Sequence, residues 1–123
     1  LKDFEAAKQY LKLAEELTIP WYLPFIHRTM AQIHGLCSEF PEAIASYRKV
    51  LELDPSDTEV LFEMATTYEE FESDKTVAFQ FYRQYIEKSG KGALNEAYAR
   101  SRMAKIREAL FFDNRGKNLM LPE

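Results

Sequence analysis

Apolar positions along the chain recur at a helical spacing in three places. In each copy a small residue is followed four positions later by a bulky one, and three positions after that by another apolar residue. Steps of four and three keep such residues on one face of an α-helix, and the small residue lets a neighbouring helix approach closely. The pattern predicts three helices that each pack tightly against a partner, with the stripes Ala7/Leu11/Ala14, Ala43/Tyr47/Val50 and Ala78/Tyr82/Tyr85.

The segments that carry these stripes repeat at a nearly constant interval. The first stripe begins 36 positions before the second, and the third begins 35 positions after it, at Ala7, Ala43 and Ala78. A different pair of residues, Met30-Ala31, recurs 34 positions later as Met64-Ala65. Each period therefore contains a second helical stretch before the stripe, and the sequence predicts two helices per repeat.

A four-residue break, Asp54-Pro55-Ser56-Asp57, separates one repeat from the next. Proline lacks the backbone N–H that a helix interior needs, so Pro55 ends the preceding helix. We expect Asp57 to cap the following helix by accepting backbone N–H bonds.

These features together resemble the tetratricopeptide repeat proteins, whose unit of about 34 residues is a helix, a turn and a second helix. The strongest likeness lies in residues 40–55, which combine an aromatic residue before the second helix, the Ala43/Tyr47/Val50 stripe and a closing Leu-Asp-Pro. The chain departs from the family pattern at four places. His27 and Leu61 stand where Trp is frequent, His34 replaces a frequent Tyr, and Gly90 replaces a closing Pro.

The resemblance implies an all-α fold, a right-handed solenoid of antiparallel helix pairs with about six helices. We expect the second helix of an incomplete repeat in residues 1–18, complete repeats in 19–56 and 57–90, and a closing helix in 91–112 that runs from about Ala93 to Phe112. That last helix either opens a third repeat or caps the solenoid, and the absence of a following partner helix favours a cap. Residues 113–123 are predicted to be a flexible tail, with docking of the apolar Leu119-Met120-Leu121 as the alternative.

Composition agrees with a helix-rich globular chain. Hydrophobic residues make up 46% and charged residues 29%, with only four Gly and five Pro. The net charge of −4 argues against nucleic acid as a partner, because such proteins cluster Lys and Arg against phosphates. The most apolar stretch, residues 19–26, is short and contains two prolines, so we expect no membrane-spanning segment. The chain starts at Leu1 rather than Met, which suggests a longer parent protein.

Charge reverses sign along the second half of the chain. Residues 57–74 carry seven acidic side chains and no Lys or Arg, whereas residues 91–117 carry seven basic and three acidic ones. We expect neighbouring helices to pair these charges.

No residue pattern predicts catalysis, a metal site or a cofactor. Cys37 is the single cysteine and is expected to be a buried thiol. His27 and His34 lie two helical turns apart, too far to share a metal ion without further ligands, so both are interpreted as core or groove residues. The carboxylates of Glu63, Glu69 and Glu70 are interpreted as a solvated helix face. The chain is therefore predicted not to be an enzyme.

The resemblance places a binding groove on the first helices of successive repeats, which in this family receives an extended peptide or a helix of a partner protein. Mapped onto this chain, the groove residues are Phe25, Arg28, Gln32 and Leu36, then Glu59, Phe62, Glu63, Thr66, Glu69 and Glu70, then Tyr98, Ser101, Arg102 and Lys105. The carboxylate clamp with which some members hold acidic chaperone tails is absent, because Glu63 stands where Asn is needed and Glu59 adds negative charge. We expect a ligand with basic or aromatic character instead.

Two further interpretations remain open. Phe4, Ala7, Leu11 and Ala14 lack a preceding helix in this sequence, and an uncovered apolar face favours homo-oligomers through the first helix. The chain is alternatively a non-catalytic arm of a larger protein. Residues 106–112 resemble the closing helix of some bacterial exported repeat proteins, which favours the periplasm or envelope over the cytoplasm.

Overall fold

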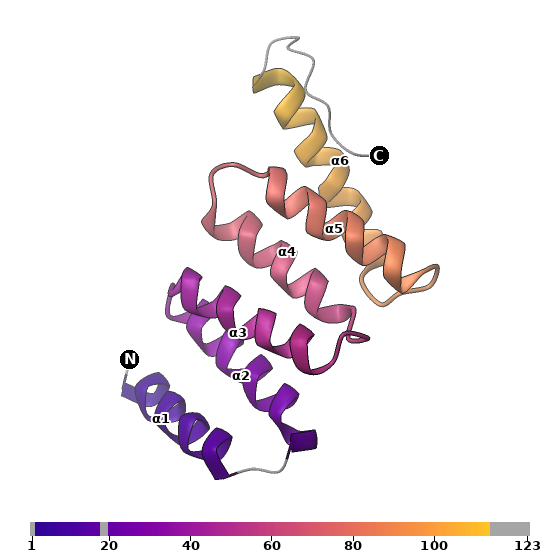
Figure 1. Ribbon diagram of the computed structural model, residues 1–123. Coiled ribbons are helices and arrows are strands. Elements are labelled where there is room, and N and C mark those ends of the chain that lie inside the picture. Colours follow the sequence, from indigo (N-terminus) through magenta and orange to yellow (C-terminus); the bar gives the residue numbers. More distant parts are fainter. Residues whose placement is uncertain (1, 18–19, 114–123) are drawn as a thin grey trace. The chain divides into compact units, whose positions relative to one another are not determined.

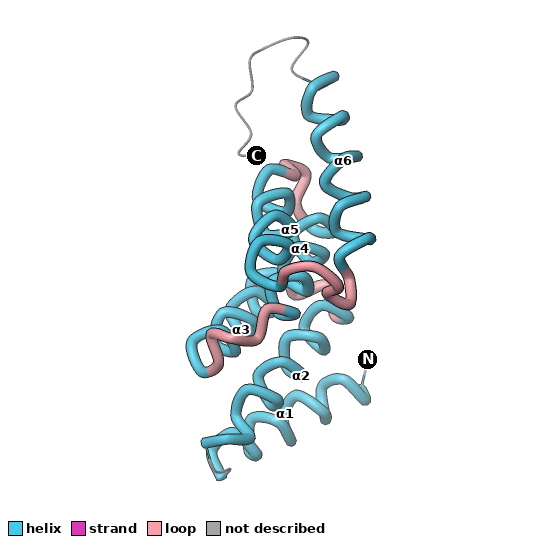
Figure 2. The backbone as a smooth tube through the Cα atoms, turned by 90° about the vertical axis from the view of Figure 1, so that its right-hand side faces the viewer, coloured by secondary structure: helices cyan, strands magenta, loops and turns pink. Residues whose placement is uncertain are grey.

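The computed structural model describes residues 2–17 and 20–113, and every regular element within these ranges is helical (Figures 1 and 2). In chain order the elements are α1 (Lys2–Leu17), the 3-10 helix η1 (Pro20–Tyr22), α2 (Leu23–Leu36), α3 (Phe40–Leu53), α4 (Glu59–Phe71), α5 (Thr76–Ser89) and α6 (Glu96–Asp113). The predicted all-α helical repeat is confirmed. Helix α6 begins three residues later than expected, and the predicted tail after Asp113 lies outside the described residues.

The chain divides into two compact units, Leu1–Val60 and Leu61–Glu123. The first contains α1, η1, α2, α3 and the first two residues of α4, and the second contains the rest of α4 with α5 and α6. Each unit has its own buried apolar residues, and each is described by itself below.

Helices α2 and α3 form the centre of the first unit as an antiparallel pair (Figure 1). Ala31 of α2 and Ala43 of α3 are both fully buried, as the close approach of two helices requires. Tyr47 and Val50 are buried along the same stripe of α3. Burying a side chain of that size contributes about 1.5–3 kcal/mol, so the predicted stripe stabilises this pair.

Helix α1 packs against α2, but its stripe is covered less completely than the stripes of α3 and α5. Phe4, Ala7, Leu11 and Ala14 are all half-buried, so the expectation that this face is uncovered is only partly correct. Two polar contacts reach from α1 to α2 and to the turn between α2 and α3. Lys8 Nζ donates to Glu39 Oε1 at 2.9 Å, and Glu15 Oε2 lies 3.0 Å from His27 Nε2.

In the second unit α5 lies beside both α4 and α6 (Figure 1). Ala78, Tyr82 and Tyr85 of α5 are fully buried, which confirms the third predicted stripe. Buried tyrosines need partners for their hydroxyls. Tyr85 Oη accepts the backbone N–H of Asn95 at 2.9 Å and so fixes the turn that leads into α6.

Two turns use left-handed backbone conformations. Ser38, between α2 and α3, has φ 60°, and Gly90, which ends α5, has φ 77°. Only glycine adopts such angles without steric cost, so Gly90 suits its position, whereas Ser38 carries some strain.

The turn before α4 differs from its prediction in detail. Asp57, expected to cap the helix, lies two residues before its first residue, Glu59. Its Oδ2 accepts a hydrogen bond from Arg28 Nη1 at 2.8 Å. The carboxylate therefore links this turn to α2 within the first unit.

Candidate functional site

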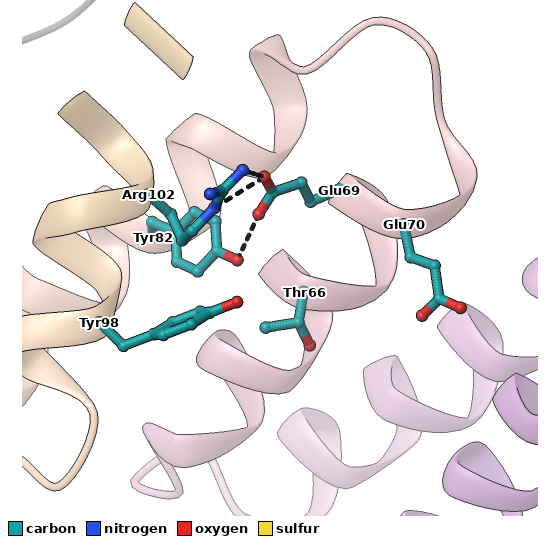
Figure 3. A pocket seen from close by; sticks show the side chains of 6 residues that line it. All are labelled: Thr66, Glu69, Glu70, Tyr82, Tyr98 and Arg102. Carbon is teal, nitrogen blue, oxygen red and sulfur yellow. Dashed lines mark hydrogen bonds and ion pairs between the residues drawn. The ribbon is translucent and has the colours of Figure 1, made fainter. Parts of the chain in front are cut away.

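A pocket of about 260 Å³ opens on the second unit (Figure 3). It is lined by Thr66, Glu69 and Glu70 of α4, Tyr82 of α5, and Tyr98 and Arg102 of α6. Thr66, Glu69 and Glu70 share one face of α4 because they are three and four positions apart, and Tyr98 and Arg102 share a face of α6 for the same reason. Three helices thus contribute to one small site.

Glu69 holds the centre of the pocket through two hydrogen bonds from other helices (Figure 3). Its Oε1 accepts the hydroxyl of Tyr82 at 2.7 Å, and its Oε2 accepts Nε of Arg102 at 2.9 Å. A second guanidinium nitrogen of Arg102, Nη2, also donates to Oε2. The carboxylate therefore ties α4 to both α5 and α6.

Burial alone opposes ionisation of Glu69, but the hydrogen bonds from Arg102 and Tyr82 outweigh it and hold the pKa of this carboxyl below its ordinary value. The reverse holds for the phenol. Burial, followed by the hydrogen bond to Glu69, raises the pKa of Tyr82, so Tyr82 stays protonated and remains a donor. The hydrogen bond with Glu69 likewise raises the pKa of Arg102.

This geometry corrects one interpretation of the sequence and supports another. Glu69 is not part of a solvated face, because only 15% of its side chain is exposed and it bonds to two buried or half-buried partners. Its pairing with Arg102 confirms that the acidic and basic segments meet at neighbouring helices.

Three lining residues remain accessible around this network. The ring of Tyr98 is 52% exposed and Glu70 is exposed, while Thr66 lies between them (Figure 3). The hydroxyl of Thr66 donates to the backbone carbonyl of Glu63 at 2.9 Å, and its oxygen keeps the capacity to accept a hydrogen bond. The open part of the pocket therefore offers an aromatic ring, a hydroxyl and a carboxylate.

Phe62 is half-buried and is not among the residues that line the pocket. Its ring centre is 5.4 Å from that of Tyr85, 5.7 Å from that of Tyr98 and 6.0 Å from that of Tyr82. Such tilted and edge-on contacts stabilise aromatic clusters. Phe62 was predicted to line the groove, and in the structure it supports the lining residue Tyr98.

The predicted groove residues of the first unit lie along α2 and at the start of α4. Phe25 and Leu36 are largely exposed apolar side chains, Gln32 is exposed, and Arg28 and Glu59 are half-buried. Because these residues and those of the pocket fall in different units, a single continuous groove stays a prediction.

The repeat itself is matched by a known family. The family model described as Tetratricopeptide repeat matches residues 29–57, which include the second half of α2, all of α3 and the turn before α4. The chain contains a tetratricopeptide repeat. Repeats of this family mediate protein–protein interactions, so a protein partner follows for this chain as well. No curated protein matches the chain.

Within the described part of the chain, no helix is both long enough and apolar enough to cross a membrane. Among the same residues, no three His, Cys, Asp or Glu side chains gather in a way that would hold a metal ion.

The histidines and the cysteine of the first unit have structural surroundings. His27 is buried, as expected, and His34 Nδ1 lies 2.7 Å from Oε1 of Glu39. Cys37 was expected to be buried and is instead partly exposed, because it lies just beyond the last residue of α2.

The sequence did not reveal the pocket contact of Tyr82 or an exposed aromatic patch in the first unit. Tyr82 was assigned only to the packing stripe, yet its hydroxyl reaches the pocket, and a tyrosine in place of phenylalanine at a buried position is a signal for such a partner. Trp21 and Tyr22 were not singled out either. Their stacked rings, 4.8 Å apart, adjoin Phe25 and form an exposed aromatic patch at the start of α2.

Proposed function

We propose that this tetratricopeptide repeat protein is a non-catalytic module that binds an extended peptide or a helix of a partner along the first helices of its repeats. The observation that carries the proposal is the pocket on the second unit. Five of the residues mapped to the groove line it together, namely Thr66, Glu69, Glu70, Tyr98 and Arg102. They come from α4, the expected first helix of its repeat, and from α6, the closing helix, which contributes if it follows the same path.

The same pocket supports a binding role over catalysis. Its most buried charge, Glu69, is ionised and held by Arg102 and Tyr82. A general acid or base must instead exchange a proton near neutral pH, where this carboxyl stays ionised. The arrangement fits a rigid surface that positions exposed groups for a partner.

An acidic C-terminal tail is a poor fit to this surface. The pocket contains two carboxylates, Glu69 and Glu70, against one guanidinium that is already paired. A further anion would meet net negative charge there. The proposed partner segment therefore has basic or aromatic character.

The test is a selection of random peptides displayed on phage, followed by titration of the selected peptides against the chain. Tyr98→Ala and Glu70→Lys alter exposed lining residues, and we expect each to weaken binding at least about fivefold. Phe111→Ala and Glu108→Lys make the same kinds of change elsewhere on α6, at exposed positions, and serve as matched controls. Equal loss in lining and control variants would count against the pocket as the binding site.

A second candidate function, self-association through α1, rests on a separate observation. Ala6, Gln9, Tyr10 and Leu13 line a hollow of about 450 Å³ on α1, and Tyr10 and Leu13 are 72% and 51% exposed. This hollow lies on a different side of α1 from the stripe originally expected to pair. Sedimentation velocity at several concentrations tests it: self-association that Leu13→Lys abolishes supports the proposal, and a concentration-independent monomer contradicts it.

A further inference from the structure

We infer that the pocket between α4 and α6 receives one cationic side chain, a lysine or an arginine, from the partner peptide. The inference rests on the proposed peptide-binding function and names the side-chain chemistry that the site selects. It is drawn from the size of the pocket, the distribution of its charge and the state of its aromatic ring.

The size of the pocket fits a single side chain. Sites for drug-sized molecules and cofactors usually enclose about 300–1,000 Å³. The volume here, about 260 Å³, is below that range. The pocket is therefore better suited to one residue of a peptide than to a free small molecule.

The unbalanced charge in the pocket is negative. Arg102 gives Nε and Nη2 to Glu69, so this guanidinium is committed to a carboxylate that is itself held ionised. Glu70 takes no part in that network and is exposed (Figure 3). The net charge of the lining groups is one negative unit, which attracts a cation and repels a phosphate or a carboxylate.

Tyr98 supplies a surface for the stem and head of such a cation. Its ring is half exposed and is held by the edge-on contact with Phe62, at an interplanar angle of 75°. An aromatic face attracts an ammonium or guanidinium group, and the methylene stem of Lys or Arg packs on the same ring. Thr66, which lies between Tyr98 and Glu70, adds a hydroxyl to the lining (Figure 3).

An aromatic side chain fits less well, although the sequence left that alternative open. The hydroxyls and carboxylates that line the pocket would lose water, and an aromatic side chain offers them at most one hydrogen-bond donor, so groups left without a partner would cost free energy. A cationic head instead donates to several of them at once. This asymmetry decides between the two alternatives.

The test uses blocked single amino acids as probes on the intact chain, followed by backbone amide NMR. N-acetyl N-methylamides of lysine and arginine are titrated into the millimolar range, with norleucine as the uncharged control of similar length. We expect the lysine and arginine probes to shift the amides of Thr66, Glu70 and Tyr98, and the norleucine probe to leave them in place. Comparison of lysine with arginine identifies the better occupant.

Variants separate this site from general attraction to an acidic protein. Glu70→Gln and Tyr98→Leu should each weaken probe binding about fivefold, and Tyr98→Phe, which keeps the ring, should leave it within about twofold. Glu108→Gln is the matched control and should change nothing. Equal shifts with norleucine, or equal losses in Glu70→Gln and Glu108→Gln, would overturn the inference.

The outcomes also distinguish this inference from the proposed function. If selected peptides bind the pocket but lack Lys and Arg, the inference fails and the peptide-binding function stands. If no displayed peptide binds while the cationic probes still shift the pocket amides, the pocket chemistry stands and the peptide-binding function fails.

Discussion

Arg102 of α6 and Glu69 of α4 join two helices through a carboxylate that is mostly shielded from solvent, with Nε and Oε2 2.9 Å apart. The two residues are 33 positions apart in the chain. Such a pair matters for stability mainly because removal of one partner leaves the other charge unpaired in a half-buried site, which costs free energy.

We expect Arg102→Gln to lower the free energy of unfolding by about 2 kcal/mol, since it leaves the ionised Glu69 without its cation. The double variant Arg102→Gln/Glu69→Gln should recover part of that loss. Urea unfolding of both single variants and the double variant gives the coupling energy directly. Strictly additive effects would show that the pair contributes nothing beyond its separate residues.

We expect the free energy of unfolding to fall at acid pH because particular carboxyl groups become protonated. Hydrogen bonds hold the pKa of Glu69 and that of Glu39 below the ordinary value of 4.5. A carboxyl whose pKa is lower in the folded state than in the unfolded state stabilises the fold. This stabilisation is fully present at a pH above the pKa of the unfolded state, and it is lost as the pH falls through the pKa of the folded state. We expect the stability difference between the native chain and Glu69→Gln to be constant from pH 7 to about pH 5 and to shrink below pH 4.5. Denaturant titrations along this range check it, and a difference that grows in acid would reverse the sign.

The left-handed turn residues give a pair of opposite predictions. Ser38→Gly relieves the cost of φ 60° and should stabilise the chain by up to about 1 kcal/mol. Gly90→Ala places a Cβ at φ 77° and ψ −173°, a conformation that is essentially restricted to glycine, and should destabilise the chain by about 1–3 kcal/mol. An ideal Cβ at Gly90 would meet no atom within 4 Å, so the expected loss comes from the backbone alone. Thermal unfolding of both variants measures the two effects, and a shift of the same sign in both would contradict this explanation.

Phe62→Ala is expected to act on folding before it acts on binding. The substitution removes the ring that contacts Tyr82, Tyr85 and Tyr98, and deletions of such rings cost about 3 kcal/mol. Tyr98→Ala, at a half-exposed ring, should cost less than about 1.5 kcal/mol. The urea midpoints of the two variants measure these losses of stability. Equal losses would indicate that the Phe62 ring is no more buried than that of Tyr98.

The helices were predictable because their signal is local. The Ala43/Tyr47/Val50 and Ala78/Tyr82/Tyr85 stripes specify both a helix and its buried face, and the structure places them as expected. The environment of Glu69 was not predictable from its own neighbours, since its partners lie 13 and 33 positions away on other helices. The reversal of charge along the chain indicated that some such pairing exists without naming the residues.

The sequence pattern around a residue also failed to predict its surroundings where the residue type suits more than one environment. A single thiol fits a core or a helix end equally well, and Cys37 occupies the latter. On α1 the small-and-bulky stripe was correctly placed on a helix, but its degree of coverage depends on which helices surround it, and that is a property of the assembled unit.

The partial coverage of α1 has a consequence for the order in which the molecule opens. Its Ala7/Leu11/Ala14 stripe is half-buried where the corresponding residues of α3 and α5 are buried, and its polar ties to the rest of the unit include Lys8–Glu39 and Glu15–His27. Helices with less buried apolar surface detach at lower free energy than the unit as a whole. The amide hydrogens of α1 should therefore exchange with solvent deuterium before those of α2 and α3, so that the first unit frays from one identifiable helix while its central pair stays closed.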